Sequence, residues 1–177
     1  MSQTCKDSAV LFSGRIFRVV EVLQQLPDGS SIAREVVRHP GAVVVLPLVD
    51  DSRICMVRNF RPAVGQTLLE LPAGTLEPGE DPLETARREL AEETGYRAER
   101  VEHLLSFFMS PGILDERMHV FLATGLAPGR QSLETGEQLE PLLVPLTEAL
   151  AMARDGRIQD AKTLAALLYY WTFRRGG

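Results

Sequence analysis

The stretch from Gly74 to Tyr96, GTLEPGEDPLETARRELAEETGY, constrains this chain more than any other part of the sequence. Its second half predicts an acidic helix from Asp81 to Thr94, because Asp81 is a favourable N-cap, a proline follows it, and a glycine follows the last residue. Three glutamates of this helix stand at i, i+3 and i+4, which places their carboxylates along one stripe of its surface. Like charges at this spacing destabilise a helix, so the sequence predicts a compensating cation.

The three carboxylates belong to Glu89, Glu92 and Glu93. Divalent ions such as Mg²⁺ and Mn²⁺ prefer carboxylate and water ligands and commonly bridge substrate phosphates. The alternative for a glutamate-rich helix is a solvated acidic face, here partnered by Arg87 and Arg88. The residues that surround the helix favour the metal site.

These residues follow the pattern G-x5-E-x7-R-E-U-x-E-E-x-G-U, in which U is a bulky apolar residue. Every fixed position is filled, by Gly74, Glu80, Arg88, Glu89, Leu90, Glu92, Glu93, Gly95 and Tyr96. This pattern is the Nudix box. The chain therefore resembles the Nudix hydrolases, which cleave a nucleoside diphosphate linked to another moiety.

Further features resemble the ADP-ribose pyrophosphatase branch of that superfamily. Pro111 lies at the place, counted from Tyr96, where ADP-ribose enzymes of the superfamily carry a proline, and the loop around it is also similar. The segments RPAVG at 61–65 and LELPAG at 69–74 match the same branch. The resemblance implies hydrolysis of ADP-ribose to AMP and ribose 5-phosphate.

The resemblance also implies a metal site. Mg²⁺ or Mn²⁺ would be held by Glu89, Glu92, Glu93 and the backbone carbonyl of Ala73. Arg88 projects from the same helix, and we expect it to pair with Glu89 or Glu92 and orient that side chain.

In this branch a glutamate from the loop before the last strand helps to activate the water. Glu134 and Glu137 are the candidates in this chain, and a solvated loop carboxylate is the alternative for either one. Glu116, in the loop that contains Pro111, is a further candidate contact to substrate or metal.

Arg61 and Glu77 match positions that hold the substrate in this branch. Arg61 precedes a proline and is expected in an extended loop, where its guanidinium could stack on a base or bind phosphate; an ordinary surface arginine is the alternative. Arg15 and Ile16 match an N-terminal segment that, in the family, reaches across a dimer to the adenine or ribose.

The pattern of strands and helices predicts an α/β or α+β fold with a mixed sheet, and the resemblance implies a Nudix-type α/β/α sandwich. The sequence predicts two parts: a small N-terminal antiparallel β unit at residues 1–39 and the Nudix domain at residues 40–177. The N-terminal unit is too thin to hold a core alone, so it must pack on the main domain or on a second subunit. A homodimer is the favoured prediction.

Composition narrows the classes of partner. The net charge is −5 and no stretch is persistently basic, which argues against nucleic-acid binding. Neither a signal peptide nor an 18-residue apolar run is visible, so no membrane association and a cytoplasmic location are expected. The two cysteines do not form a disulfide framework, and Cys55 is expected to be a buried small apolar residue.

Two alternatives to ADP-ribose hydrolysis stay open at this point. The first keeps the chemistry and changes the substrate to FAD, a nucleotide sugar, NADH or a dinucleoside polyphosphate, because the box helix recognises only the diphosphate and metal. The second is a non-catalytic module that senses ADP-ribose. Such a module could lose box glutamates, whereas all three metal-binding glutamates implied by the resemblance are present here.

Overall fold

The structure is a computed structural model that describes residues 5–133, 136 and 138–175. The chain forms two compact units. The smaller comprises Met1–Gly41 together with Phe107–Arg117, and the larger comprises Ala42–Ser106 together with Met118–Gly177.

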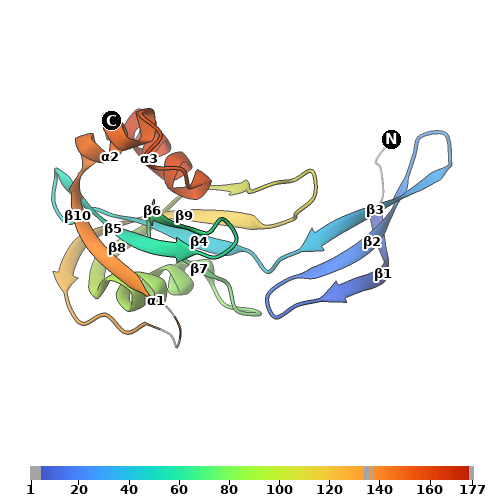
Figure 1. Cartoon of the computed structure of the whole chain (residues 1–177), viewed down its shortest axis with the longest axis horizontal. Helices are drawn as coiled ribbons and strands as arrows, with labels where there is room; N and C mark the ends of the chain where they lie inside the picture. Colours follow the sequence, from blue (N-terminus) through green and yellow to red (C-terminus); the bar gives the residue numbers. More distant parts are fainter. Residues whose placement is uncertain (1–4, 134–135, 137, 176–177) are drawn as a thin grey trace. The chain divides into compact units, whose positions relative to one another are not determined.

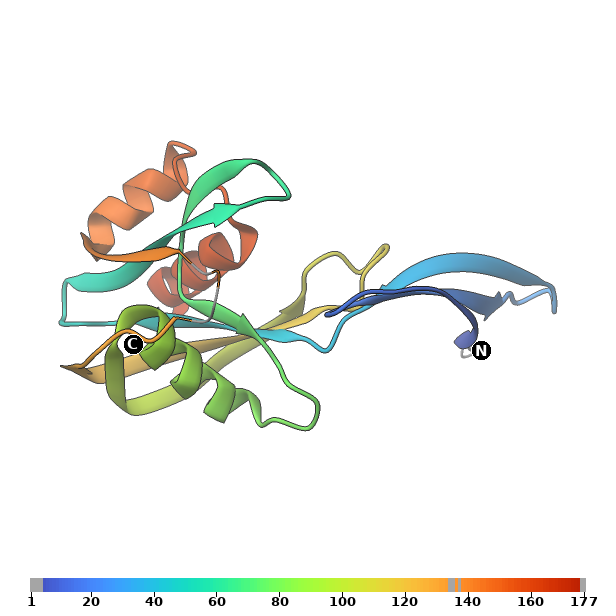
Figure 2. The ribbon, with the colours of Figure 1, turned by 60° about the horizontal axis from the view of Figure 1, so that its bottom comes forward.

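The larger unit is built on a four-stranded mixed sheet with the order β7-β4-β9-β8. Its strands are β4 (Ala42–Pro47), β7 (Ala73–Thr75), β8 (Tyr96–Phe108) and β9 (Arg117–Pro128). Strand β4 runs parallel to β9 and antiparallel to β7. Helix α1 (Pro82–Thr94) lies on one face of this sheet and α3 (Ala161–Phe173) on the other, as Figures 1 and 2 show. The predicted α/β/α sandwich is confirmed.

A second sheet in the same unit has the order β10-β5-β6 and is antiparallel throughout. Its strands are β5 (Arg53–Arg61), β6 (Gln66–Glu70) and β10 (Leu139–Pro145), and helix α2 (Leu146–Arg154) follows β10. Strand β6 ends only a few residues before β7, so the segment between them links the two sheets of the unit.

The core of the larger unit is centred on β4, every residue of which is buried. Val43 and Val45 pack with Ala86 and Leu90 of α1. Because successive strand residues point to opposite faces, the alternate residues of β4 face away from α1, toward the side of the sheet that α3 covers. Coverage on both faces explains why β4 is continuously apolar instead of alternating.

The helix ends follow the local sequence. The side chain of Asp81 caps α1 by accepting a hydrogen bond from the Leu83 backbone N–H at 2.7 Å. Gly95 ends α1 in the left-handed conformation, with a φ of 77°. Asp160 caps α3 through the Thr163 backbone N–H at 2.9 Å. Within the described part of the chain, no helix has the length and hydropathy required to cross a bilayer.

The smaller unit is a three-stranded antiparallel sheet, confirming the predicted N-terminal β unit. Its strands are β1 (Cys5–Ser13), β2 (Arg18–Gln25) and β3 (Ser31–Arg38). The loop between β8 and β9 joins this unit, since the Val37 N–H donates to the Ile113 carbonyl at 2.8 Å and the His39 N–H to Asp115 Oδ1 at 2.8 Å. The division of the chain into domains at residues 39 and 40 stays a prediction.

Candidate active site

Arg88 organises the acidic face of α1. Its Nη1 donates to Glu89 Oε1 at 2.8 Å and to Glu92 Oε2 at 3.1 Å. Its Nε and Nη2 donate to the two carboxylate oxygens of Glu80, each at 3.2 Å. The predicted pairing of Arg88 with Glu89 and Glu92 is present. One guanidinium thus offsets the repulsion between neighbouring carboxylates, and its bonds to Glu80 help to raise its own pKa and keep it charged.

Glu93 is the most buried of the three glutamates on the acidic stripe of α1, with 5% of its surface exposed. Its Oε2 accepts a hydrogen bond from the backbone N–H of Ala73 at 3.1 Å. The contact joins the C-terminal half of α1 to the first residue of β7. Ala73 and Glu93, both predicted metal ligands, are therefore neighbours.

Glu89 lies against the next residue of the same strand. A Cβ atom placed on Gly74 would fall 1.9 Å from the Glu89 carboxyl carbon and 2.0 Å from its Oε1. No side chain fits in that space, which gives the physical reason for a glycine at the first position of the box. Glu89 and Glu93 thus converge on the backbone of residues 73 and 74.

The donor chemistry of this site fits a hard divalent cation. Carboxylate oxygens and a backbone carbonyl are the ligands that Mg²⁺ and Mn²⁺ prefer, and the glycine leaves room for a carboxylate against β7. Among the described residues no group of three acidic, histidine or cysteine side chains is arranged as a metal cluster. In this structure an oxygen of each box glutamate instead accepts a hydrogen bond from Arg88 or from the Ala73 N–H.

Arg61 is the last residue of β5. The prediction that it lies in an extended loop is therefore wrong. Its Nε and Nη2 donate to the two carboxylate oxygens of Glu70, at 2.8 and 2.7 Å. Lys162 Nζ also donates to Glu70 Oε2, at 2.7 Å. Sequence reasoning missed Glu70 and Lys162, although a glutamate inside the apolar run LLEL was a signal of a buried ion pair.

The other predicted contacts are distributed over the chain. Glu77 is exposed, and its backbone N–H donates to Glu80 Oε2 at 3.3 Å. Glu134 and Glu137 lie outside the described residues.

The last three predicted contacts, Arg15, Ile16 and Glu116, belong to the smaller unit. Arg15 and Ile16 are exposed, and a carboxylate oxygen of Glu116 lies 3.9 Å from His39 Nδ1. Their contact with substrate stays a prediction.

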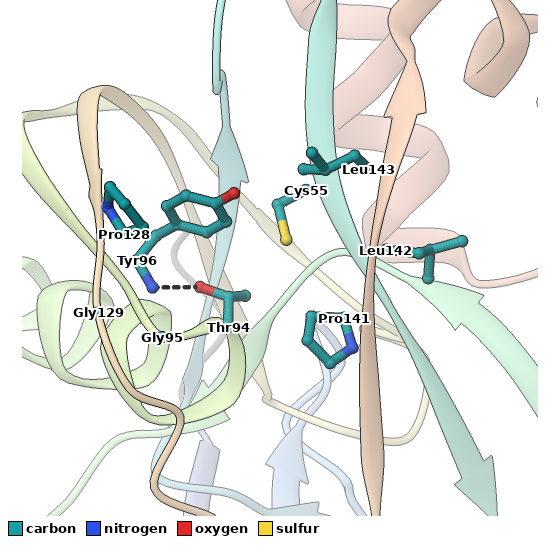
Figure 3. Close-up of a pocket in the computed structure, with 9 residues that line it drawn as sticks. All are labelled: Cys55, Thr94, Gly95, Tyr96, Pro128, Gly129, Pro141, Leu142 and Leu143. Carbon is teal, nitrogen blue, oxygen red and sulfur yellow. Dashed lines mark hydrogen bonds between the residues drawn. The ribbon is translucent and has the colours of Figure 1, made fainter.

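A cavity of about 220 Å³ opens beside the C-terminal end of α1 (Figure 3). It is lined by Cys55, Thr94, Gly95, Tyr96, Pro128, Gly129, Pro141, Leu142 and Leu143. Cys55 is buried, as predicted, and burial raises the pKa of its thiol to about 12. Of the described residues that line the cavity, none belongs to the predicted site, so the cavity is distinct from the carboxylate cluster.

An α/β/α sandwich whose acidic helix faces a glycine-containing strand is the architecture of a Nudix-type phosphohydrolase. The NUDIX domain model matches residues 37–167, and the chain belongs to the Nudix family of hydrolases.

The relatives agree with this assignment. The chain is 42% identical to the "Methanol dehydrogenase activator" of Bacillus methanolicus over 161 residues, which are 90% of this chain and 87% of the relative. Identity and coverage are the same for the "ADP-ribose pyrophosphatase" of Bacillus subtilis (strain 168). A solved structure, "Crystal structure of ADP compounds hydrolase", shares the fold with a TM-score of 0.83 at 24% identity, covering 97% of this chain and 93% of that one.

The substitution Gly74→Ala tests the contact between Glu89 and β7. The added methyl group would overlap the Glu89 carboxyl, and a flexible side chain yields before a strand backbone does. We expect turnover of the diphosphate substrate to fall by about 10²-fold while the melting temperature changes by only a few degrees. Because both changes act on one carboxylate, the double variant Gly74→Ala/Glu89→Gln should be no slower than Glu89→Gln alone. Full turnover of Gly74→Ala would contradict the assignment.

Proposed function

We propose that this Nudix hydrolase cleaves the pyrophosphate bond of ADP-ribose with water, yielding AMP and ribose 5-phosphate. The observation that carries the proposal is the 42% identity, over 90% of the chain, to a protein described as an ADP-ribose pyrophosphatase. The carboxylates that meet the backbone at residues 73 and 74 suit a divalent cation, which would neutralise the charge of a diphosphate.

In this proposal Mg²⁺ or Mn²⁺ is held by Glu89, Glu92, Glu93 and the carbonyl of Ala73. When bound, the ion neutralises diphosphate charge and polarises the attacking water. Arg88 orients Glu89 and Glu92 through the hydrogen bonds described above.

The proposal also assigns contacts to the substrate. Arg61 and Glu77 hold the substrate, and Glu134 or Glu137 activates the water. Glu116 is proposed as a further contact to substrate or metal, and Arg15 and Ile16 as contacts to the adenine or ribose from the other subunit of a dimer.

A panel of diphosphate compounds tests which of them is the preferred substrate. ADP-ribose, FAD, a nucleotide sugar, NADH and a dinucleoside polyphosphate are incubated with enzyme and Mg²⁺, and the products are resolved by chromatography. We expect the highest kcat/KM for ADP-ribose, AMP as a product, and loss of hydrolysis in excess EDTA. A higher kcat/KM for another diphosphate would replace the substrate and keep the chemistry. Full activity in EDTA would exclude the metal site.

Removing one charge from the box tests the role of the carboxylates. Glu93→Gln preserves size and should lower turnover by at least about 10²-fold without unfolding the protein. The matched control is Glu84→Gln on the first turn of the same helix, where the side chain is 68% exposed and outside the acidic stripe. We expect the control to keep its rate, and equal rates for the two variants would argue against the box as the metal site.

We further propose that the working unit is a homodimer formed through the N-terminal sheet. Every residue of β1 is exposed, and its apolar side chains Val10, Leu11 and Phe12 are 58%, 53% and 55% exposed. A three-stranded sheet with such a surface gains stability by burying it. A second copy of the chain would offer the same apolar strand, which suits an isologous interface.

Sedimentation at micromolar concentration tests the dimer. We expect a species of twice 19.6 kDa, because burial of the β1 surface favours association. Val10→Lys/Phe12→Lys should produce a species of 19.6 kDa, whereas Phe173→Lys, at a 65% exposed phenylalanine of the larger unit, should not. A wild-type protein that sediments as a monomer would contradict the proposal.

A further inference from the structure

A network of four charges, two of them buried, lies between the second sheet and the N-terminus of α3. Glu70 is 1% exposed and Lys162 is 7% exposed. Lys162 Nζ bonds to Glu70 Oε2 at 2.7 Å and to Asp160 Oδ1 at 2.8 Å. Arg61 completes the network through its two hydrogen bonds to Glu70.

The four charges balance, with two cations and two anions. Burial alone would raise the pKa of Glu70, but the hydrogen bond from Arg61 and the charge of Lys162 together hold that pKa below its ordinary value. Glu70 is therefore ionised at neutral pH. Removing either cation would leave a buried carboxylate incompletely compensated, which is costly in a protein interior.

The network also sets the direction of Arg61. A guanidinium is a rigid planar fork, so two bonds from its Nε–Nη2 edge fix the plane and turn the Nη1 edge away from Glu70. The Arg61 side chain is anchored by Glu70 and still 42% exposed. The hydrogen bond to Glu70 raises the pKa of Arg61, so the guanidinium stays charged.

The same turn of α3 holds the strand that leads to the carboxylates. The Leu71 N–H donates to Thr163 Oγ1 at 2.9 Å, and this hydroxyl donates to Asp160 Oδ2 at 2.6 Å. Two residues later the Ala73 N–H meets Glu93. Hydrogen bonds thus tie the segment between β6 and β7 to the cap of α3 at Leu71 and to the box at Ala73.

We propose that Lys162 is a positioning residue for substrate binding. Its ammonium group fixes the Glu70 carboxylate, and Glu70 in turn aims Arg61 at the diphosphate of the substrate. The inference rests on the proposed function, because Arg61 is there a substrate contact. Without Lys162, Glu70 and Asp160 would share Arg61 as their one cation in the network, and the guanidinium would turn toward them.

A double-mutant cycle tests the proposal. Arg61→Ala, Lys162→Met and the double variant are compared with the wild type, using the substrate with the highest kcat/KM in the panel. We expect each single substitution to raise KM by about tenfold or more, with a smaller effect on kcat, because a hydrogen bond to a charged group is lost or misdirected. Lys162→Met should add nothing to KM once Arg61 is absent, because it acts through Arg61. Effects that multiply in the double variant would overturn the proposal.

The single variants distinguish the role of Arg61 as a substrate contact from the role of Lys162 as a positioning residue. An unchanged KM for Arg61→Ala would remove Arg61 as a substrate contact and the positioning role with it. A raised KM for Arg61→Ala with an unchanged KM for Lys162→Met would overturn the positioning role alone. Lys162→Arg keeps the charge and should bind substrate more tightly than Lys162→Met. Arg157→Met, which breaks an exposed ion pair with Asp155, is the matched control and should leave KM unchanged.

Lys162→Met could fail to fold, because it leaves Glu70 undercompensated. In that case Glu70→Gln/Lys162→Met removes one charge of each sign and restores the balance. This variant should fold and show a KM raised as far as that of Arg61→Ala, because Arg61 has lost its anchoring carboxylate. A folded double variant with the KM of the wild type would overturn the proposal.

Discussion

The site depends on the approach of two helix carboxylates to the backbone at Ala73 and Gly74. Glu93 accepts the Ala73 N–H, and Glu89 fills the space that a side chain on Gly74 would need. Carboxylates at i and i+4 repel one another, so the arrangement requires compensation. Arg88 provides it by bonding to Glu80, Glu89 and Glu92 together.

A second layer of charge supports this arrangement from the other side of the sheet. Glu70, Lys162 and Asp160 are largely buried, and each has a partner of opposite sign within 2.8 Å. Buried ion pairs seldom add net stability, since the desolvation of each charge offsets their attraction. Their value lies in geometry: one carboxylate receives bonds from two elements, so β5 and α3 are held in a fixed relation to the strand that enters the box.

Local sequence was sufficient to predict those structural features whose physical cause lies within a few residues of chain. Asp81 caps the helix predicted from it, because capping needs only a short side chain and the next few N–H groups. The continuous apolar sequence of β4 is likewise a local pattern, typical of a strand that is buried on both faces. Arg61 was different: its proline neighbour suggested a loop, but pairing with β6 keeps it in β5. Strand pairing is a long-range property that a dipeptide does not encode.

The sequence by itself determined the Nudix family, the acidic stripe of α1 and the type of cation that it suits, because these follow from residue identity and helical spacing. Only the tertiary structure decided which groups meet those residues. Ala73 and Gly74 face Glu93 and Glu89, and Lys162 reaches Glu70, across 92 residues of chain. Such contacts arise when sheets and helices pack, and the glutamate inside LLEL became interpretable only when its buried cations were in place beside it.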